Sequence, residues 1–201
     1  FVPVGFSVKA GCVGFTLGAF DPALPLVIDP WVTYLGGSSG RSEPSGMTQT
    51  PSGGVLVIGE TGANNFPVSG GSFQNVFRGE TDAFVIALTK NGVPRWSTYF
   101  GGSGYELPRQ FRSGINGRMV AVGSTNSNDF PVSPGAFQSS RNSNWVDLFL
   151  FVLDDSLGRR YWSTYCGGSR GEYPVLLLTL HNGDILNGVQ SNSPDYPTVP
   201  V

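Results

Sequence analysis

The sequence predicts an all-β fold of four-stranded antiparallel meanders, and three observations support this prediction. The first is composition: only 13% of the 201 residues are charged, 12% are aromatic, and glycine (29) and proline (15) are abundant. Many turn-forming and aromatic residues with few charges are typical of short strands joined by tight turns. The other two observations are an internal repeat and regular hairpin signals within each copy of it.

One nine-residue motif occurs three times at nearly even spacing. It reads WVTYLGGSS from Trp31, WSTYFGGSG from Trp96 and WSTYCGGSR from Trp162. A motif copied at a period of about 65 residues indicates a repeated structural unit rather than three separate sites.

Each complete repeat is expected to hold two hairpins. The first has a polar turn, in TPSGGVLVIGET, GINGRMVAVGST and LHNGDILNGVQS. A loop follows in which Phe66, Phe130 or Tyr196 precedes a proline, and proline holds the residue before it in an extended conformation. The second hairpin runs from DAFVIALT or DLFLFVLD through a turn to the tryptophan motif. Repeated four-stranded meanders are typical of a β-propeller, in which each sheet is one blade.

The repeat divides the chain into four expected parts. These are a β-rich lead-in over 1–30, a first repeat over 31–95, a second over 96–161 and a partial third over 162–201. The lead-in contains three strand-like pieces, VPVGFSVKAG, CVGFTLGAFD and LPLVID. Closed propellers generally need about four to eight blades. We therefore expect the rest of a longer polypeptide, or other chains, to complete the propeller, and we favour the longer polypeptide because no capping repeat is visible.

The repeated segments also resemble a known family. The combination of YLGGS, VIGET, NDFPVSPGAFQ and DAFVIALTKNG resembles the bacterial β-propeller repeat family known as SBBP. The opening VGFTLGAFDPALPLVIDP is similar to the segment that leads into the first such repeat in large extracellular bacterial proteins. The resemblance covers nearly the whole chain and implies the propeller fold, but it brings no catalytic motif. Where the family commonly has one or two aspartates after GGSG, this chain has single glutamates.

Two classes of partner are disfavoured by composition. The net charge of -2 provides no basic field for a phosphate backbone, so no nucleic-acid partner is expected. The longest apolar runs, LFLFVL and VLLLTL, fall far short of the roughly 20 residues of a membrane helix, so no membrane span is expected. A glycan or protein ligand remains compatible with the sequence.

The repeated aromatic residues are expected to pack rather than to bind. Trp and Tyr alternate in each motif, which could suggest a platform for stacking sugars, but residues present in every repeat are expected to pack between blades. The same structural role is expected for the aromatic residue before each loop proline. The full structural set is Trp31, Trp96, Trp162, Tyr34, Tyr99, Tyr165, Phe66, Phe130 and Tyr196.

The acidic residues suggest two hypotheses about metal binding. Asp82 and Asp147 each open a third strand, where they are expected to accept hydrogen bonds from the preceding turn, with calcium as the alternative. Glu43, Glu106 and Glu172 each follow a GGS turn and lie close to a proline. Propeller connectivity would place them near the mouth of the central channel. There they could bind a cation or a polar ligand, or they could cap local backbone donors, which we favour.

No catalytic or cofactor-binding constellation is evident. Cys12 and Cys166 could form one disulfide, but Cys166 replaces Leu35 and Phe100 of the sister repeats, which favours a buried thiol. The single histidine, His181, is expected in an exposed hairpin turn. No cofactor is expected, with calcium as the alternative.

The sequence therefore favours a non-catalytic, extracellular or cell-surface propeller segment that acts as a scaffold, adhesion or recognition module. Two alternatives stay open. One is a polysaccharide-acting hydrolase or lyase that uses acids such as Glu106 and Glu172, and the other is a structural subunit of a multi-chain surface assembly.

Overall fold

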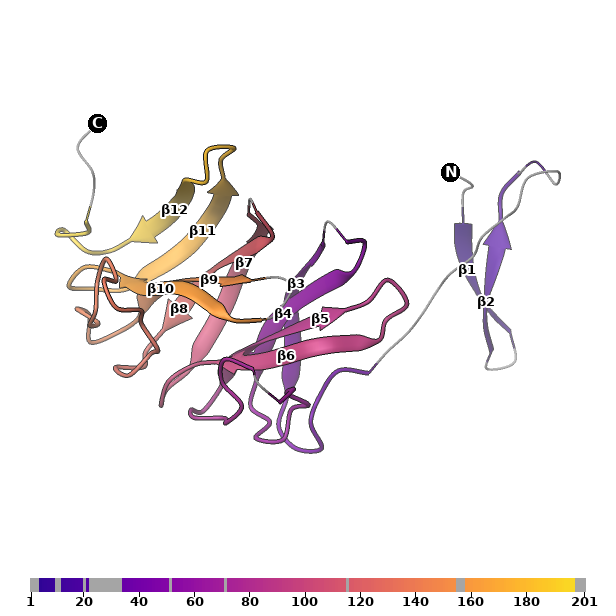
Figure 1. Cartoon of the computed structure of the whole chain (residues 1–201), viewed down its shortest axis with the longest axis horizontal. Coiled ribbons are helices and arrows are strands. Elements are labelled where there is room, and N and C mark those ends of the chain that lie inside the picture. The colour runs from indigo at the N-terminus through magenta and orange to yellow at the C-terminus, as the bar shows by residue number, and fades with distance from the viewer. Residues whose placement is uncertain are drawn as a thin grey trace. The chain divides into compact units, whose positions relative to one another are not determined.

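The computed structural model describes residues 4–9, 12–19, 21, 34–50, 52–70, 72–114, 116–154 and 158–197. The chain divides into two compact units, Phe1–Trp31 and Val32–Val201, which are described separately. Every regular element within the described ranges is a β-strand (Figure 1). None of these residues forms a helix that could cross a membrane.

The first unit contains one antiparallel hairpin. Strand β1 (Val4–Lys9) pairs with β2 (Cys12–Leu17), with Val4 opposite Leu17 and Lys9 opposite Cys12. The hairpin coincides with the first two of the three strand-like pieces expected in the lead-in. The third piece, residues 24–29, lies outside the described residues.

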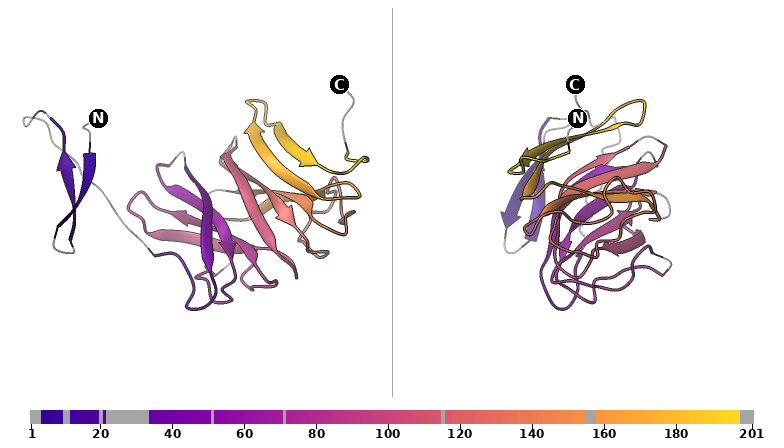
Figure 2. Two further views of the ribbon diagram at one scale, coloured as in Figure 1. Left: turned by 180° about the vertical axis from the view of Figure 1, so that it is seen from behind. Right: turned by 90° about the vertical axis from the view of Figure 1, so that its left-hand side faces the viewer.

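The second unit contains two four-stranded sheets and one two-stranded sheet (Figures 1 and 2). In each four-stranded sheet, neighbouring strands are consecutive in the chain and antiparallel. This connectivity is the expected meander, and it confirms the predicted all-β fold of propeller blades. The three sheets do not close into a ring within the described part of the chain. The first sheet comprises β3 (Ser42–Gln49), β4 (Val55–Thr61), β5 (Asp82–Leu88) and β6 (Pro94–Phe100), the second comprises β7 (Glu106–Ser113), β8 (Arg118–Thr125), β9 (Asp147–Asp154) and β10 (Arg160–Cys166), and the third comprises β11 (Glu172–Thr179) and β12 (Ile185–Ser191).

The register is the same in all three sheets. The first two strands of each sheet shift register directly after a proline, at Pro44, Pro108 or Pro174. These repeated bulges make positions in the three sheets equivalent one by one. At the opposite end of the strands, hairpin tips take positive φ at Gly53, Asn116, Gly117 and Gly183, as the SGG, NGR and NGD segments predict.

The main hydrophobic core lies between the first and second sheets. Phe100 of β6 stacks on Phe151 of β9 with ring centroids 4.0 Å apart, and Phe130 of the loop between β8 and β9 stacks on Phe149. Strand β5 is buried along its whole length, because both faces of its sheet are covered. Burial of these apolar side chains is the main force that holds blade against blade.

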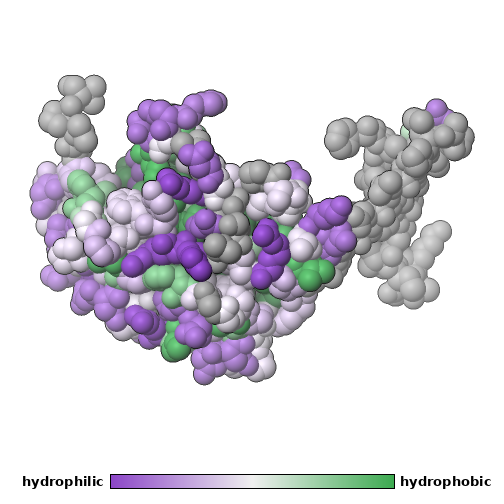
Figure 3. Space-filling model, viewed as in Figure 1, coloured by the Kyte–Doolittle hydropathy of each residue, from purple (hydrophilic) through white to green (hydrophobic). Residues whose placement is uncertain are grey.

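The third sheet leaves much more apolar surface exposed. Leu176, Leu178 and Leu186 are 51 to 60% exposed, whereas Leu177 on the opposite face is buried against the second sheet. Figure 3 shows hydrophobic surface, in green, beside the β11–β12 hairpin. The third sheet is therefore the least covered of the three.

Candidate functional site

A repeated tyrosine ties the long loop of each blade to the blade's last strand. The hydroxyl of Tyr99 donates to the carbonyl of Ala63 (2.7 Å) and accepts from the backbone N–H of Phe66 (2.9 Å). Tyr165 makes the same pair of bonds with Ser127 and Phe130. Burial raises the pKa of Tyr165 to about 12, so its hydroxyl stays protonated and can donate. Both tyrosines are structural residues in this arrangement.

The other members of the repeated aromatic set vary in exposure. Trp96 is buried and Trp162 is half-buried, while Tyr34 is 84% exposed and Trp31 lies outside the described residues. Within the described ranges, no long loop packs on Tyr34 as one packs on Tyr99. Tyr196 takes the place of Phe130 in the third repeat, and its hydroxyl lies 3.2 Å from the sulfur of Cys166.

A buried pair of acids marks the junction of the first and second sheets. Asp82, at the start of β5, accepts hydrogen bonds from the backbone N–H groups of Arg78 and Gly79 and from the side-chain amide of Gln74. Glu106, at the start of β7, accepts from the Thr125 hydroxyl (2.6 Å) and from the Gly102 N–H (3.0 Å). Both acids are fully buried. The two carboxylates therefore belong to a network that spans two blades.

Gly101 allows these carboxylates to approach each other. A Cβ at this position would lie 2.3 Å from Oε2 of Glu106 and 2.7 Å from Oδ1 of Asp82. The Gly101 N–H donates to Oε1 of Gln74, whose amide nitrogen donates to Asp82. Any side chain at Gly101 would collide with both acids, so glycine is required here by close approach rather than by backbone conformation.

The same network recurs between the second and third sheets. Asp147 accepts from the N–H groups of Asn142 and Ser143 and from Gln138. Glu172 is fully buried, and its Oε1 accepts hydrogen bonds from the hydroxyls of Ser191 and Ser193. Here Gly167 replaces Gly101 between the two carboxylates. In this copy Oε2 of Glu172 is buried without a hydrogen-bond partner.

Glu43 is not the equivalent of the other two glutamates. Glu106 and Glu172 lie opposite Thr125 and Ser191, and the residue in that register in the first sheet is Ser42, opposite Thr61. Glu43 lies one residue further along and forms an ion pair with Arg41. Because side chains alternate between faces along a strand, this one-residue offset puts Glu43 on the other face.

Burial perturbs the ionisation of the repeated acids. Desolvation raises the pKa of Asp82 to about 6 and that of Glu106 to about 7, against the opposing effect of their hydrogen bonds. Burial also raises the pKa of Asp147. A raised pKa alone can mark a functional site, but structural networks produce it as well. These carboxylates accept hydrogen bonds from local donors, which agrees with the capping hypothesis.

No group of three or more His, Cys, Asp or Glu side chains is arranged to hold a metal ion among the residues that the structure describes. Asp82 and Asp147 accept from the preceding turn, as expected from the sequence. Cys166 is a half-buried free thiol whose pKa is raised by burial, and His181 lies exposed in a hairpin turn. The side chain of Cys12 lies outside the described part of the structure.

The candidate recognition site is a surface hollow at the junction of the second and third repeats, which we call the aromatic hollow. It has a volume of about 480 Å³ and is lined by Trp145, Arg170, Gly171, Tyr173 and Asn192. Trp145 is 72% exposed and Tyr173 is 46% exposed. A Cβ on Gly171 would lie 3.7 Å from Cβ of Trp145 and 3.8 Å from Cε2 of Tyr173, so Gly171 lies beside both aromatic residues.

The backbone of Trp145 is held firmly although its ring is exposed. Its N–H donates to the Ser143 hydroxyl (2.8 Å), and its carbonyl accepts from the Arg141 guanidinium (2.6 Å). Arg141 in turn donates to Asn128. An exposed indole on a fixed backbone is well suited to stacking on a ligand.

Sequence reasoning missed this hollow, although the repeat carried a signal for it. In the preceding junction, Glu80 occupies the position of Trp145, Gly104 that of Arg170 and Leu107 that of Tyr173. The hollow residues are thus specific to one junction, and blade packing does not require them because the other junction packs without them. Comparing equivalent positions would have singled them out.

Comparison with known proteins supports the fold. Residues 31–67 match the family model of the SBBP beta-propeller repeat. No curated protein matches the chain. The matched segment covers β3, β4 and the start of the long loop, and the hairpin, loop and tyrosine bonds of this region recur in the second sheet. This match and the four-stranded meanders together support the SBBP-type β-propeller repeat family.

Proposed function

We propose that the chain is a non-catalytic module of an extracellular or cell-surface protein, in which propeller blades act as a scaffold for a recognition surface. The observation that carries the proposal is the contrast between repeated and unrepeated residues. The repeated polar and aromatic side chains bond or pack within the blades. Trp145 and Tyr173 are exposed, and the equivalent positions of the preceding junction hold other residue types. The resemblance of the opening segment to one in large extracellular proteins supports the proposed location.

The aromatic hollow favours a carbohydrate ligand. Its two exposed rings can stack on the apolar faces of sugars, and Arg170 and Asn192 add hydrogen-bond donors beside them. A shallow, polar-rimmed site of this kind suits adhesion with modest affinity per site, which several modules in one protein would strengthen.

A binding measurement tests this proposal. The protein would be titrated with soluble hexasaccharides of glucose, N-acetylglucosamine, mannose and xylose, and followed by tryptophan fluorescence and calorimetry. We expect at least one sugar to bind, and both Trp145→Ala and Tyr173→Ala to weaken it by about tenfold or more. Tyr161→Ala, which removes an exposed ring near the other end of the strands, serves as the control. Absence of binding by every sugar, or equal binding by all variants, would contradict the proposal.

The hydrolase or lyase alternative has less support. Glu106 and Glu172, the acids that it would use, are fully buried, and each already accepts hydrogen bonds from its own blade network. A general acid must reach the substrate, directly or through one water molecule. The enzyme hypothesis predicts that Glu106→Gln abolishes cleavage of a polysaccharide, whereas the scaffold hypothesis predicts that there is no cleavage to abolish.

The assembly alternative has a specific observation in its favour. The third sheet exposes Leu176, Leu178 and Leu186 on one face. A second blade docked there would cover them, as the second sheet covers the first. Native mass measurement of material from its source, compared with the mass of the denatured chain, distinguishes a multi-chain assembly from a longer polypeptide.

A further inference from the structure

We propose that the edge of β12 that faces away from β11 accepts a β-hairpin from a partner segment, and that this hairpin differs from those of the other sheets at two defined positions. It carries a small residue opposite Val189 and a polar residue opposite Asn187. The inference rests on the proposed scaffold function and adds the chemistry of the segment that the scaffold binds.

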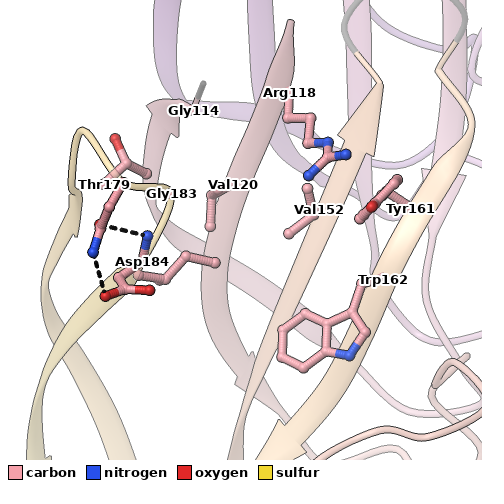
Figure 4. Close-up of a pocket in the computed structure, with 11 residues that line it drawn as sticks. Gly114, Arg118, Val120, Val152, Tyr161, Trp162, Thr179, Gly183 and Asp184 are labelled. Atoms are coloured by element: carbon pink, nitrogen blue, oxygen red, sulfur yellow. Dashed lines mark hydrogen bonds between the residues drawn. The ribbon is translucent and has the colours of Figure 1, made fainter. Parts of the chain in front are cut away.

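The edge of β12 borders a cavity. This cavity, which we call the edge cavity, has a volume of about 390 Å³. A second cavity of about 330 Å³ lies toward the hairpin tips, where Val120, Val152 and Trp162 face Asp184 of the third sheet (Figure 4). Trp162 and Ile185 line both. The edge cavity is lined by Phe137, Leu150, Trp162, Thr164, Cys166, Ile185, Asn187 and Tyr196.

The walls of the edge cavity correspond to residues that are packed in the preceding junction. Leu150, Trp162 and Cys166 are equivalent to Val85, Trp96 and Phe100, which belong to the core between the first two sheets. There the space is filled by Phe149, Phe151 and Leu153 of β9. The edge cavity therefore has the position that a third strand would occupy beside β12.

The exposure of Phe137 supports this reading. Its equivalent, Phe73, is half-buried and stacks on Phe100 with ring centroids 4.9 Å apart. Phe137 is 66% exposed, although the surrounding loop is otherwise alike. It lacks the covering that the next blade gives to Phe73.

Asn187 indicates a polar neighbour. Its Oδ1 and Nδ2 atoms are buried, and neither has a hydrogen-bond partner. The equivalent residues Val57 and Ala121 lie opposite Ile86 and Phe151. An apolar residue opposite Asn187 would leave the amide unsatisfied, which is costly, so the incoming strand must offer a donor and an acceptor there.

Val189 indicates a small neighbour. Its equivalents are Gly59 and Gly123, which lie opposite Phe84 and Phe149. A Cβ on either glycine would lie only 2.7 or 2.4 Å from an atom of that ring. A valine at this position therefore excludes phenylalanine from the incoming strand, because the ring has no room.

The register of β4–β5 and β8–β9 fixes the remaining positions. An aspartate faces the last residue of the second strand, and a leucine faces Val55 and Met119, the equivalents of Ile185. The incoming strand should thus place aspartate, a small residue, a polar residue and an apolar residue opposite Ser191, Val189, Asn187 and Ile185. Main-chain hydrogen bonds along the edge supply affinity, and these four side chains supply specificity.

Two hairpin peptides test the inference. The first has the sequence of residues 147–168 of this chain, and the second is the same with Phe149→Ala and Phe151→Asn, both with Cys166→Ser and a fluorescent label. Binding to the full chain is followed by fluorescence anisotropy. We expect the second peptide to bind at least about tenfold more tightly than the first. On the protein variant Asn187→Ala/Val189→Gly, which restores the residue types of the second sheet, the preference should reverse.

Hydrogen exchange locates the bound peptide. Backbone amides of β12 that point away from β11 should exchange more slowly when the second peptide is present, while those of β4 should not change. Failure of both peptides to bind both proteins, or a preference of the unaltered protein for the first peptide, would overturn the proposal. So would protection of β12 that appears without peptide and grows with protein concentration, because a second copy would then cover the edge. Sugar binding at the aromatic hollow is independent of all these results.

Discussion

Replacing Glu106 by glutamine should destabilise the protein at pH 5 but not at pH 8. Glu106 has a pKa of about 7 because burial disfavours its charged form. In the unfolded chain the same group titrates near its ordinary value of about 4.3. The native state therefore binds this proton more tightly, so stability is greatest below about pH 4 and falls as pH rises through about 7.

The magnitude follows from the difference in proton affinity. A tenfold difference corresponds to about 1.4 kcal/mol, so between pH 5 and pH 8 Glu106 should cost the native state about 2 to 3 kcal/mol. Glutamine has no charge to bury, but its one carbonyl oxygen cannot accept from both the Thr125 hydroxyl and the Gly102 N–H. The lost bond costs about 1 to 2 kcal/mol at every pH.

We therefore expect Glu106→Gln to be less stable than the unaltered protein at pH 5 and as stable or more stable at pH 8. Urea unfolding at pH 5, 6, 7 and 8 measures this, with Glu80→Gln as the matched change of an exposed glutamate. The reasoning is refuted if the unaltered protein gains stability between pH 5 and pH 8, or if the two proteins keep a constant difference. Asp82, with a pKa of about 6, should leave a smaller pH dependence in the variant.

Three further predictions concern the blade framework. Tyr99→Phe removes the hydroxyl that joins the long loop to β6 and should lower the free energy of unfolding by about 1 to 3 kcal/mol in urea, whereas Tyr34→Phe, at an exposed position, should change it little. Gly101→Ala places a methyl group against two carboxylates and should lower the free energy of unfolding by more than about 3 kcal/mol or prevent folding. Gly70 has open space around it, so Gly70→Ala should leave the thermal midpoint nearly unchanged. Burial raises the pKa of Cys166 and a hydroxyl contacts its sulfur, so iodoacetamide at pH 7.5 should label it many-fold more slowly in the native protein than in urea. Peptide mass spectrometry measures the labelling of this cysteine, and equal rates would contradict the buried thiol.

Strand number, strand order and turn positions were predictable because each depends on local sequence. Alternating apolar residues predict the strands, glycine-containing turns predict the hairpins, and the three copies of the motif predict the repeat. The equivalence of Glu43 with Glu106 was inferred from nearness to a proline, and this failed because the spacing between acid and proline differs by one residue. In a strand, one residue decides which face a side chain occupies.

The acid networks were only partly predictable. The sequence indicates that Asp82 accepts from its own turn, but its approach to Glu106 brings together the third strand of one blade and the first of the next. Such contacts depend on how the sheets pack against each other, and no local sequence pattern predicts that packing. Gln74 and Gln138, which complete both networks, carried a signal in the repeated phenylalanine–glutamine pair.

The two ends of the strands differ in what they tolerate. The acid networks and tyrosine bonds described above lie at the end where a blade passes into the next. The hairpin tips near Gly53, Gly92 and Gly183 lie at the other end, where the turn residues bond mainly to residues close in the chain. Insertions or chain breaks at the tips should therefore leave the joints between blades intact. A cut between β6 and β7 would separate Gly101 from Glu106 and dismantle a joint. The unit that can be moved, copied or permuted without damage is thus one that begins and ends at a hairpin tip, out of phase with the sheets themselves.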